Sequence, residues 1–393
     1  MNTIDTIIAG CFWTSLAGVG YAYAGYPVVI YGLSRLFGRN AQPPRIAEVD
    51  LPSVALLIVA HNEASVIESR IKNALALSYP RHRLQIVIAS DGSDDATCEI
   101  CRRWTGDVLT IEFTQRRGKA AALNDAVSRM TADVIVLSDA NTFMDSDALM
   151  RLTSWFFADE TVGAVSGRLV LTDPRTGRNV DSVYWRYETF LKQCEGRLGG
   201  LLGANGAIYA IRRSLFEPLR AGTIVDDFMV PLVARMRSGC RIVYDAHAVA
   251  HEETPADLSM EFRRRARIGV GGFQALATLW PLLSPRHGWT AFTFWSHKVM
   301  RWISPFLLVA MLLSSLLLIS QPLFRIALVA QVAFYASCFV GTMLPPANRV
   351  ARVLRIFGMF AAMNLALLTG FFRWLVSSQS GIWKRTERVP AAA

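Results

Sequence analysis

Between residues 54 and 253, short apolar stretches alternate with longer stretches of helical periodicity. The short stretches are rich in Val, Ile and Leu and end in polar residues, which is typical of buried β-strands. They cover Val54–Ala60, Leu84–Ala89, Val108–Phe113 and Val134–Ser138. The intervening stretches predict helices over Glu63–Leu77, Asp95–Trp104 and Lys119–Arg129. Strands that alternate with helices predict an α/β fold with a mainly parallel, doubly wound sheet.

Four much longer apolar stretches flank this region. One precedes it, from Thr6 to Leu36, and three follow it, at Val299–Ser320, Leu323–Leu344 and Ile356–Val376. A helix needs about 20 apolar residues to cross a bilayer. The first stretch lacks the basic start and the short length of a signal peptide. The pattern therefore predicts an integral membrane protein with one amino-terminal anchor and three carboxyl-terminal spans.

Arginines near the spans indicate their orientation. They follow the anchor (Arg35, Arg39 and Arg45) and separate the last two spans (Arg349, Arg352 and Arg355). Because basic residues favour the cytoplasmic side, both segments and the region after the anchor are expected in the cytoplasm. Counting four spans then leaves the carboxyl tail outside, although it carries Lys384, Arg385 and Arg388. Either one segment is re-entrant or the tail departs from the rule.

The segment Asp257–Leu283 combines an arginine cluster with large apolar residues, a pattern typical of an amphipathic helix at a membrane interface. A second interfacial segment is expected at His287–His297. The predicted organisation is therefore an anchor, a catalytic domain, an interfacial region, the carboxyl-terminal spans and a tail. Their expected ranges are 1–40, 50–255, 256–297, 298–377 and 378–393.

Composition and charge agree with this division. The hydrophobic fraction is 52%, and the formal charge is +10. A basic excess can indicate nucleic acid, but the chain has no long Lys/Arg run with interleaved aromatic residues, so membrane lipids and phosphate are the expected partners. Cys98 and Cys101 form a lone Cys-x-x-Cys pair. Because no second pair completes a zinc site, they are interpreted as ordinary thiols.

Polar residues follow three of the predicted strands. They are His61-Asn62-Glu63, the run Asp91–Asp95, and Asp139-Ala140-Asn141. Ligands of open α/β sheets bind beyond the carboxyl ends of the strands, so these residues are expected to converge on one edge. A single Asp after a strand is usually a helix cap or a turn residue. Three acidic strand ends in one sheet instead favour a binding site.

The motifs at these positions resemble those of family 2 glycosyltransferases. The resemblance begins with Ile58–Glu63 and Ile88–Ser93 and covers roughly residues 54 to 280. It continues in the family's order through Gly118-Lys119, Ser138–Asn141, Gly203–Gly206, Asp226-Asp227 and Arg264–Ile268. It implies a GT-A fold, an α/β nucleotide-diphospho-sugar transferase domain, here flanked by spans like those of polysaccharide synthases.

The resemblance implies a donor site for a nucleotide sugar. Asp91 matches the aspartate that holds the nucleoside, and a carboxylate can accept hydrogen bonds from uracil or ribose. Lys119 is placed to meet donor charge, although a solvated helix-start lysine is nearly as plausible. The remaining expected donor contacts are His61, Glu63, Asp139, Arg264 and Arg267. Forked hydrogen bonds from the two arginines suit a diphosphate, with lipid headgroups as the competing ligand.

Asp139 and Asn141 occupy the positions of the family's Asp-x-Asp metal motif. Oxygen ligands of this kind suit Mg²⁺ or Mn²⁺, which would bridge the donor diphosphate. Asn141 replaces the second acid, so the ion would be bound with less charge. The alternative is that Asn141 caps the next helix.

Asp227 matches the family's catalytic base, which takes the proton of the acceptor hydroxyl. Asp226 replaces the usual Glu beside it, and the resemblance implies that it contacts the acceptor. Capping of the helix expected at Phe228–Arg237 is the alternative role for these acids. Gly203, Asn205 and Gly206 resemble the acceptor-side loop, where small residues let a sugar approach the backbone. A plain glycine-rich turn is an equal alternative.

The implied activity is that of an inverting hexosyl- or N-acetylhexosaminyltransferase. It would use a UDP-sugar and a saccharide or lipid-linked acceptor to form β-linked cell-surface polysaccharide at a bacterial inner membrane, with its catalytic domain in the cytoplasm. Two alternatives stay open: a processive synthase that secretes its β-glycan, and an inert membrane subunit of a synthesis complex. Ile268 stands where processive synthases carry Trp, which favours single additions.

Overall fold

The computed structural model describes residues 2–40, 42–43, 51–172, 183–253, 258–343 and 349–376. The chain forms two compact units. The membrane-helix unit comprises Met1–Val29, Asp257–Leu276 and Phe294–Ser377. The sheet unit comprises Ile30–Ala256, Ala277–Thr293 and Ser378–Ala393. The expected separate interfacial region, 256–297, is thus divided between the two units.

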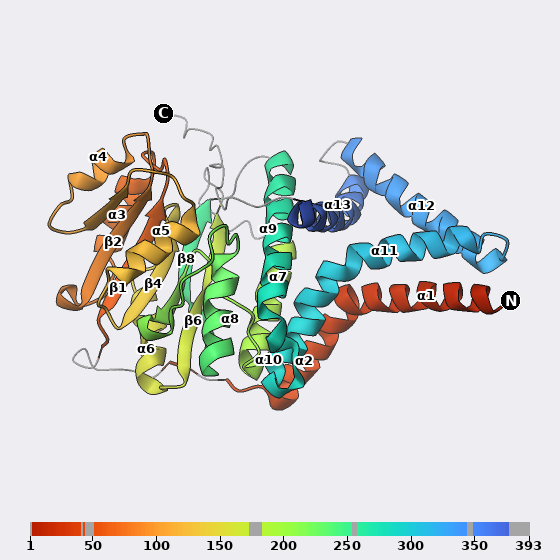
Figure 1. Cartoon of the computed structure of the whole chain (residues 1–393), viewed down its shortest axis with the longest axis horizontal. Helices are drawn as coiled ribbons and strands as arrows, with labels where there is room; N and C mark the ends of the chain where they lie inside the picture. Colours follow the sequence, from red (N-terminus) through yellow and green to blue (C-terminus); the bar gives the residue numbers. More distant parts are fainter. Residues whose placement is uncertain are drawn as a thin grey trace. The chain divides into compact units, whose positions relative to one another are not determined.

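The sheet unit is built on one eight-stranded sheet of order β3-β2-β1-β4-β7-β6-β8-β5 (Figure 1). Its strands are β1 (Val54–Ala60), β2 (Leu84–Asp91), β3 (Leu109–Phe113), β4 (Val134–Asp139), β5 (Thr142–Met144), β6 (Val162–Thr172), β7 (Tyr209–Arg212) and β8 (Arg241–Glu253). The half β3-β2-β1-β4 is parallel, as predicted. In the other half β7 runs antiparallel to both neighbours, β6 and β8 are parallel, and β5 is antiparallel to β8. The sheet is therefore mixed.

The helices of this unit are α3 (Ile67–Leu75), α4 (Thr97–Arg102), α5 (Lys119–Ser128), α6 (Ala148–Ala158), α7 (Val183–Leu198), α8 (Asp226–Ser238) and α10 (Trp289–Thr293). Four of them, α3, α4, α5 and α8, begin within a few residues of the predicted positions, and α6, α7 and α10 were not predicted. Predicted helix Glu63–Leu77 starts four residues later in the structure, because the backbone N–H groups of Glu63 and Ala64 bond to the side chains of Thr97 and Asp95. Those side-chain acceptors replace a first helical turn and hold the chain in a loop.

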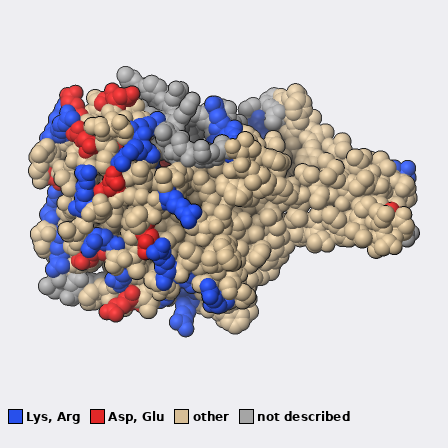
Figure 2. Space-filling view, viewed as in Figure 1, with Lys and Arg blue, Asp and Glu red and all other residues tan. Residues whose placement is uncertain are grey.

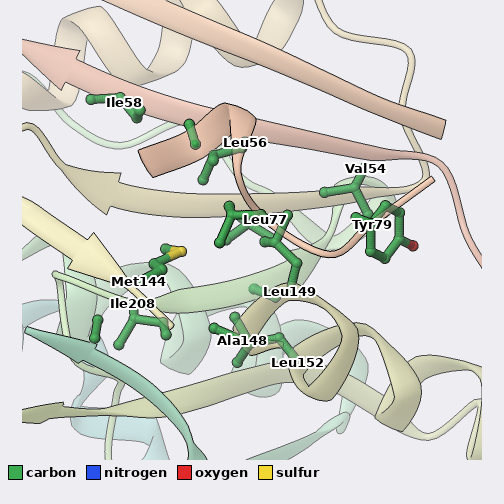
Figure 3. Close-up of a cluster of buried hydrophobic side chains, with 14 of the residues drawn as sticks. Val54, Leu56, Ile58, Leu77, Tyr79, Met144, Ala148, Leu149, Leu152 and Ile208 are labelled. Atoms are coloured by element: carbon green, nitrogen blue, oxygen red, sulfur yellow. The ribbon is translucent and has the colours of Figure 1, made fainter. Parts of the chain in front are cut away.

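Both faces of the central strands are covered, since every residue of β1 is buried. On one face Val54, Leu56 and Ile58 pack in a core with residues of α3 and α6 (Figure 3). On the other face α5 contacts β1 and β2. Burial on both sides explains why the sequence shows continuous apolar runs instead of alternation. The same packing fixes where the carboxyl ends of β1, β2 and β4 lie.

Leu149 of α6 tests this core, because its side chain is 0% exposed. Leu149→Ala is expected to destabilise the sheet unit by about 2–5 kcal/mol, since it removes apolar contacts and leaves a cavity. Thermal unfolding of the purified protein measures this as a lower apparent Tm. The exposed Leu109→Ala, at 44% exposure, serves as the control and is expected to change the Tm little.

The chain also contains helices that are long and apolar enough to cross a membrane, most of whose residues belong to the membrane-helix unit. In the described residues four such candidates run over Thr3–Phe37, Trp289–Leu317, Pro322–Gly341 and Val353–Val376. They include α1 (Thr3–Gly20), α2 (Tyr26–Phe37), α11 (Met300–Leu317), α12 (Pro322–Met343) and α13 (Arg349–Val376). Lys, Arg, Asp and Glu are scattered over the visible surface of the sheet unit, whereas these helices show very few (Figure 2). The four predicted spans are thus present as apolar helices.

One detail of the predicted membrane region is wrong. Arg349, Arg352 and Arg355 were expected in a loop, but α13 begins at Arg349 and includes all three. Arginine is a good helix former, so these residues continue the helix from its apolar part toward the amino terminus. The expected interfacial segment His287–His297 is, from Trp289 onward, continuous with the candidate span that ends at Leu317. Arg45 and the basic tail lie outside the described residues.

The predicted amphipathic helix is present as α9 (Leu258–Leu279), and it packs closely on α13. A Cβ added to Gly370 would lie 2.8 Å from the carbonyl oxygen of Ala266, and one added to Gly269 would lie 3.4 Å from the Cα of Leu367. The ring centroids of Phe273 and Phe371 lie 5.0 Å apart. Small residues therefore let the two helix backbones approach, as in packed membrane helices.

Candidate active site

Asp91 is the last residue of β2 and is fully buried. One carboxylate oxygen accepts a hydrogen bond from the backbone N–H of Arg117 at 2.9 Å, and the other accepts from Gly118 at 2.8 Å. Gly118 has a φ of +91°, a conformation that favours glycine. Asp91 thus fixes the turn that starts α5 and sets the position of Lys119.

His61, Asn62 and Glu63 follow β1 at the same edge of the sheet. The Nδ1–H of His61 donates to the carbonyl oxygen of Asp91 at 2.8 Å. Asn62 adopts a φ of +56°, and its side-chain amide exchanges hydrogen bonds with Asp94 at 2.6 and 3.0 Å. The structure therefore brings the predicted donor residues after β1 and β2 together.

Lys119 lies between two carboxylates. Its Nζ is 2.9 Å from Asp139 Oδ1, at the end of β4, and 3.2 Å from Asp226 Oδ2, at the start of α8. Burial raises the pKa of Asp226 to about 6, against the opposing attraction of Lys119. Burial alone lowers the pKa of Lys119, but the charges of Asp139 and Asp226 outweigh it and the net shift is upward. The ammonium group is therefore an internal cation in an acidic site.

Asn141 lies in the turn between β4 and β5. Its Nδ2 donates to Glu252 Oε1 at 2.8 Å. Because a carboxylate only accepts, this bond fixes which side of the amide carries the oxygen. The oxygen consequently faces away from Glu252, an orientation in which it remains available as a ligand.

Asp227 is held by the loop that precedes β7. Its Oδ2 accepts from the backbone N–H of Gly206 at 3.2 Å, and its Oδ1 accepts from Phe228 at 3.0 Å. The backbone carbonyl of Asp227 accepts from Ala204 at 2.9 Å. As the first residues of α8, Asp226 and Asp227 also lie at the positive end of the helix dipole, which favours ionised carboxylates. The helix-start role and a base role are therefore compatible.

The predicted acceptor loop divides into two parts. Gly203 and Gly206 contact the start of α8, and a Cβ on Gly206 would lie 3.3 Å from Asp227 Oδ2. Asn205 is 7% exposed; its N–H donates to Ser166 Oγ at 3.0 Å, and its amide bonds to Gly167 and Lys192. Asn205 therefore fastens the loop to β6, while the glycines leave room beside Asp227.

Gly203 carries a specific requirement for glycine. Its φ is +74°, and an added Cβ would lie 2.9 Å from the Cα of Phe228. Gly203→Ala is therefore expected to cost at least about 1–3 kcal/mol and to displace Asp227, reducing turnover. Apparent Tm and nucleotide release measure the two effects. Gly239→Ala is the matched control: its φ is also +74°, but nothing lies within 4 Å, so only stability should fall.

Two buried side chains near the acids escaped the sequence analysis. Tyr209 of β7 is 0% exposed, and its hydroxyl has no hydrogen-bond partner among the described residues. Burial and then the charges of Asp226, Asp227 and Asp139 raise its pKa well above the ordinary value. Arg70 of α3 is also 0% exposed. The sequence could have indicated Arg70, because it is a charged residue on an otherwise apolar helix face.

Arg264 and Arg267, the other predicted donor contacts, lie on α9 in the membrane-helix unit. Arg264 is exposed, Arg267 is half-buried, and Ile268 is 41% exposed. Their contact with the donor remains a prediction. The sheet unit itself supplies the cluster of Lys119, Asp139, Asp226 and Asp227.

Comparison with known proteins identifies the family to which the chain is similar. The glycosyltransferase-like family 2 matches residues 52–271. The chain is 28% identical over 246 residues to poly-β-1,6-N-acetyl-D-glucosamine synthase of Staphylococcus aureus (strain COL), covering 59% of this chain and 58% of the relative. It is 28% identical over 250 residues to the probable glycosyltransferase YdaM of Bacillus subtilis (strain 168), covering 60% and 59%. The chain thus spans less than two thirds of either relative.

A solved structure supports the fold. The mannosyltransferase PcManGT from Pyrobaculum calidifontis, in complex with GDP-Man and Mn²⁺, superposes with a TM-score of 0.68 at 22% identity, covering 93% of this chain and 99% of that one. Because the family match extends over more than half of the 393 residues, the chain belongs to the family 2 glycosyltransferases and has their GT-A fold.

Proposed function

We propose that this protein transfers a sugar, with inversion, from a UDP-sugar to a saccharide or lipid-linked acceptor in cell-surface polysaccharide synthesis. The observation that carries the proposal is the cluster at the carboxyl edge of the sheet, where Lys119 joins Asp139 to Asp226 and where Gly206 holds Asp227. The likeness to a poly-N-acetylglucosamine synthase supports the polysaccharide setting.

On the donor side, Asp91, His61 and Glu63 are assigned to the nucleoside end. The carboxylate of Asp91 is already oriented by two backbone N–H groups, so a nucleoside would meet a rigid acceptor. Lys119 is assigned to the diphosphate, because its ammonium group is the nearest positive charge to Asp139. Arg264 and Arg267 are assigned to the same diphosphate from α9.

The residues at the end of β4 fit a divalent ion. Among the described residues, no three His, Cys, Asp or Glu side chains gather as a metal site. Asp139 and Asn141 offer a carboxylate oxygen and an amide oxygen, and Mg²⁺ often binds through one or two such protein oxygens and completes its coordination with substrate phosphates. Asp139 and the amide oxygen of Asn141 would hold the ion. When bound, it would neutralise charge on the departing nucleotide.

For the chemical step, Asp227 accepts the proton of the acceptor hydroxyl as the hydroxyl oxygen attacks the anomeric carbon. The bond from that carbon to the diphosphate breaks, and UDP leaves with the bonding electron pair. One displacement on an α-linked donor gives a β-linked product. Asp226 is buried and its carboxylate is paired with Lys119, so it is less accessible to an acceptor hydroxyl than Asp227.

The membrane helices suggest where the reaction occurs. Four candidate spans and basic residues after the first support a bacterial inner-membrane protein with its sheet unit in the cytoplasm, next to the nucleotide-sugar pool. Poly-β-1,6-N-acetyl-D-glucosamine synthase is a relative, so a processive synthase is the second candidate. Exposed Ile268 at the position of the processive enzymes' Trp favours single additions.

The direct test is nucleotide release by the purified full chain in lipid, with Mg²⁺ or Mn²⁺. The donor panel should contain UDP-sugars, with UDP-N-acetylglucosamine among them, and GDP-mannose. Metal-dependent UDP release with a β-linked product supports the proposal, and product length separates single addition from polymerisation. Release from GDP-mannose alone would replace the donor assignment. A folded protein that turns over no donor on any acceptor would favour an inert subunit.

A further inference from the structure

Arg70 is the largest fully buried side chain in the described part of the protein. It lies on the inward face of α3 with Ile67, Ile71 and Ala74, all of them 0% exposed. A charged side chain at such a position requires compensating contacts, because its desolvation is costly. An aliphatic residue would complete the apolar face more simply, so the contacts of the guanidinium group indicate its role.

One arm of Arg70 reaches the residue before Asp139. Its Nη2 donates to Ser138 Oγ at 3.1 Å, and Ser138 Oγ in turn donates to the carbonyl oxygen of Ala207 at 2.9 Å. Ala207 directly follows Gly206, whose N–H binds Asp227 Oδ2. This arm therefore ties the end of β4 to the loop that orients Asp227.

The other arm reaches the far side of the same turn. Arg70 Nη1 donates to Asn73 Oδ1 at 3.0 Å, and that oxygen also accepts from the N–H of Met144 at 3.0 Å. Asn73 Nδ2 donates to the carbonyl oxygen of Met144 at 2.9 Å. Met144 ends β5, so the guanidinium group is linked to both flanks of the segment Asp139–Asn141, directly through Ser138 and indirectly through Asn73.

The charge of Arg70 also acts on this segment. Burial lowers its pKa to about 10, against the opposing effect of Asp139, so the group stays protonated at neutral pH. Lys119, which pairs with Asp139, and Arg70, which bonds to Ser138, place two positive charges near the three acids Asp139, Asp226 and Asp227. A neutral residue in place of Arg70 therefore removes both its hydrogen bonds to Ser138 and Asn73 and its positive charge.

We propose that Arg70 is a positioning residue that holds the Asp139–Asn141 turn in the geometry needed to bind a divalent ion with the nucleotide diphosphate. It touches neither the ion nor the donor, and it acts through Ser138 and Asn73. The inference rests on the proposed metal-binding role of Asp139 and Asn141. Partners of this kind orient ligands, and their loss typically weakens metal binding by about 10–100-fold.

The test measures binding of UDP to the full chain in lipid nanodiscs by calorimetry over a series of Mn²⁺ concentrations; GDP replaces UDP if the donor panel selects a guanine nucleotide. In the wild type Mn²⁺ is expected to tighten nucleotide binding, and Asp139→Asn is expected to abolish this gain. Arg70→Gln should lower the affinity for Mn²⁺ by at least about 10-fold. Arg70→Lys retains charge but cannot bond to both flanks as a fork, so its Mn²⁺ affinity should be intermediate.

Arg212→Gln is the matched control. The guanidinium group of Arg212 likewise makes several hydrogen bonds, to the backbone carbonyls of Val162 at 2.8 Å, Phe156 at 2.7 Å and Asp159 at 3.4 Å, but it lies at the opposite end of β7 from Tyr209. Loss of Arg212 should lower the apparent Tm and leave unchanged the increase in nucleotide affinity that Mn²⁺ produces. A similar unchanged gain in Arg70→Gln would overturn the inference.

The outcomes separate this inference from the proposed function. If Mn²⁺ has no effect on nucleotide binding in the wild type, the proposed metal site fails first. If Asp139→Asn loses the gain while Arg70→Gln and Arg70→Lys keep it, only the role of Arg70 fails. Should Arg70→Gln not fold, Asn73→Ala decides, because it frees Met144 while leaving the guanidinium group in place; an unchanged Mn²⁺ affinity there would also overturn the inference.

Discussion

Asp227→Asn is expected to reduce turnover by about 10²–10⁴-fold, the usual contribution of a general base. The asparagine is nearly the same size, and its single amide oxygen can retain one of the two hydrogen bonds that Asp227 accepts, from Gly206 or from Phe228, so the loop and the start of α8 should largely keep their positions. Nucleotide release in lipid measures the loss. Donor affinity and apparent Tm should change little, because the proton acceptor is the group removed.

Asp159→Asn is a suitable control for that substitution. Asp159 is an acid of the sheet unit that pairs with Arg241 and bonds to Thr161, remote from the cluster in sequence and contacts. It should retain wild-type turnover. If Asp227→Asn keeps more than a tenth of the wild-type rate, the base is another group, and Asp226 becomes the first candidate.

Lys119→Met should have the second large effect, on both donor binding and stability. The substitution leaves Asp139 and the 7% exposed Asp226 without their shared cation. Removing one partner of a buried ion pair typically costs about 3–5 kcal/mol, because the remaining charge is uncompensated; the partial exposure of Asp139 places Lys119 at the lower end. Nucleotide affinity without metal should fall with it, because the diphosphate then meets Asp139 and Asp226 without the ammonium group that offsets their charge.

Calorimetry and thermal unfolding test Lys119→Met against Lys72→Met. Lys72 forms an ion pair with Glu68 at 2.8 Å, but both side chains are largely exposed, so solvent screening makes that pair weak. The control should behave as the wild type. Equal behaviour of the two variants would contradict the assignment of Lys119 as the cation of the site.

The parallel half of the sheet could be predicted because its strands are buried on both faces. Continuous apolar runs such as Val54–Ala60 indicate buried parallel strands when helical patterns alternate with them. The second half was harder, because β6 and β8 include charged and polar residues such as Arg168, Asp245 and His247. Their pairing is set by contacts between distant parts of the chain, which no local pattern encodes.

The candidate site shows the same division. Asp91, Asp139 and Asp227 stand at strand ends or a helix start, so their convergence follows from the order of elements. Arg70 and Tyr209 lie inside a helix and a strand, and their relation to the acids depends on which faces are turned inward. A charged residue on an apolar face signals a special role, but its partners Ser138 and Asn73 emerge only from the packing.

The close packing of α9 on α13 limits how this enzyme can be shortened for study. A soluble fragment that ends before the spans would retain Gly269 and Phe273 but lose the residues of α13 that cover them. The exposed apolar stripe would then promote aggregation of the fragment. Biochemical work should therefore use a protein that retains residues 349–376, in nanodiscs or a mild detergent.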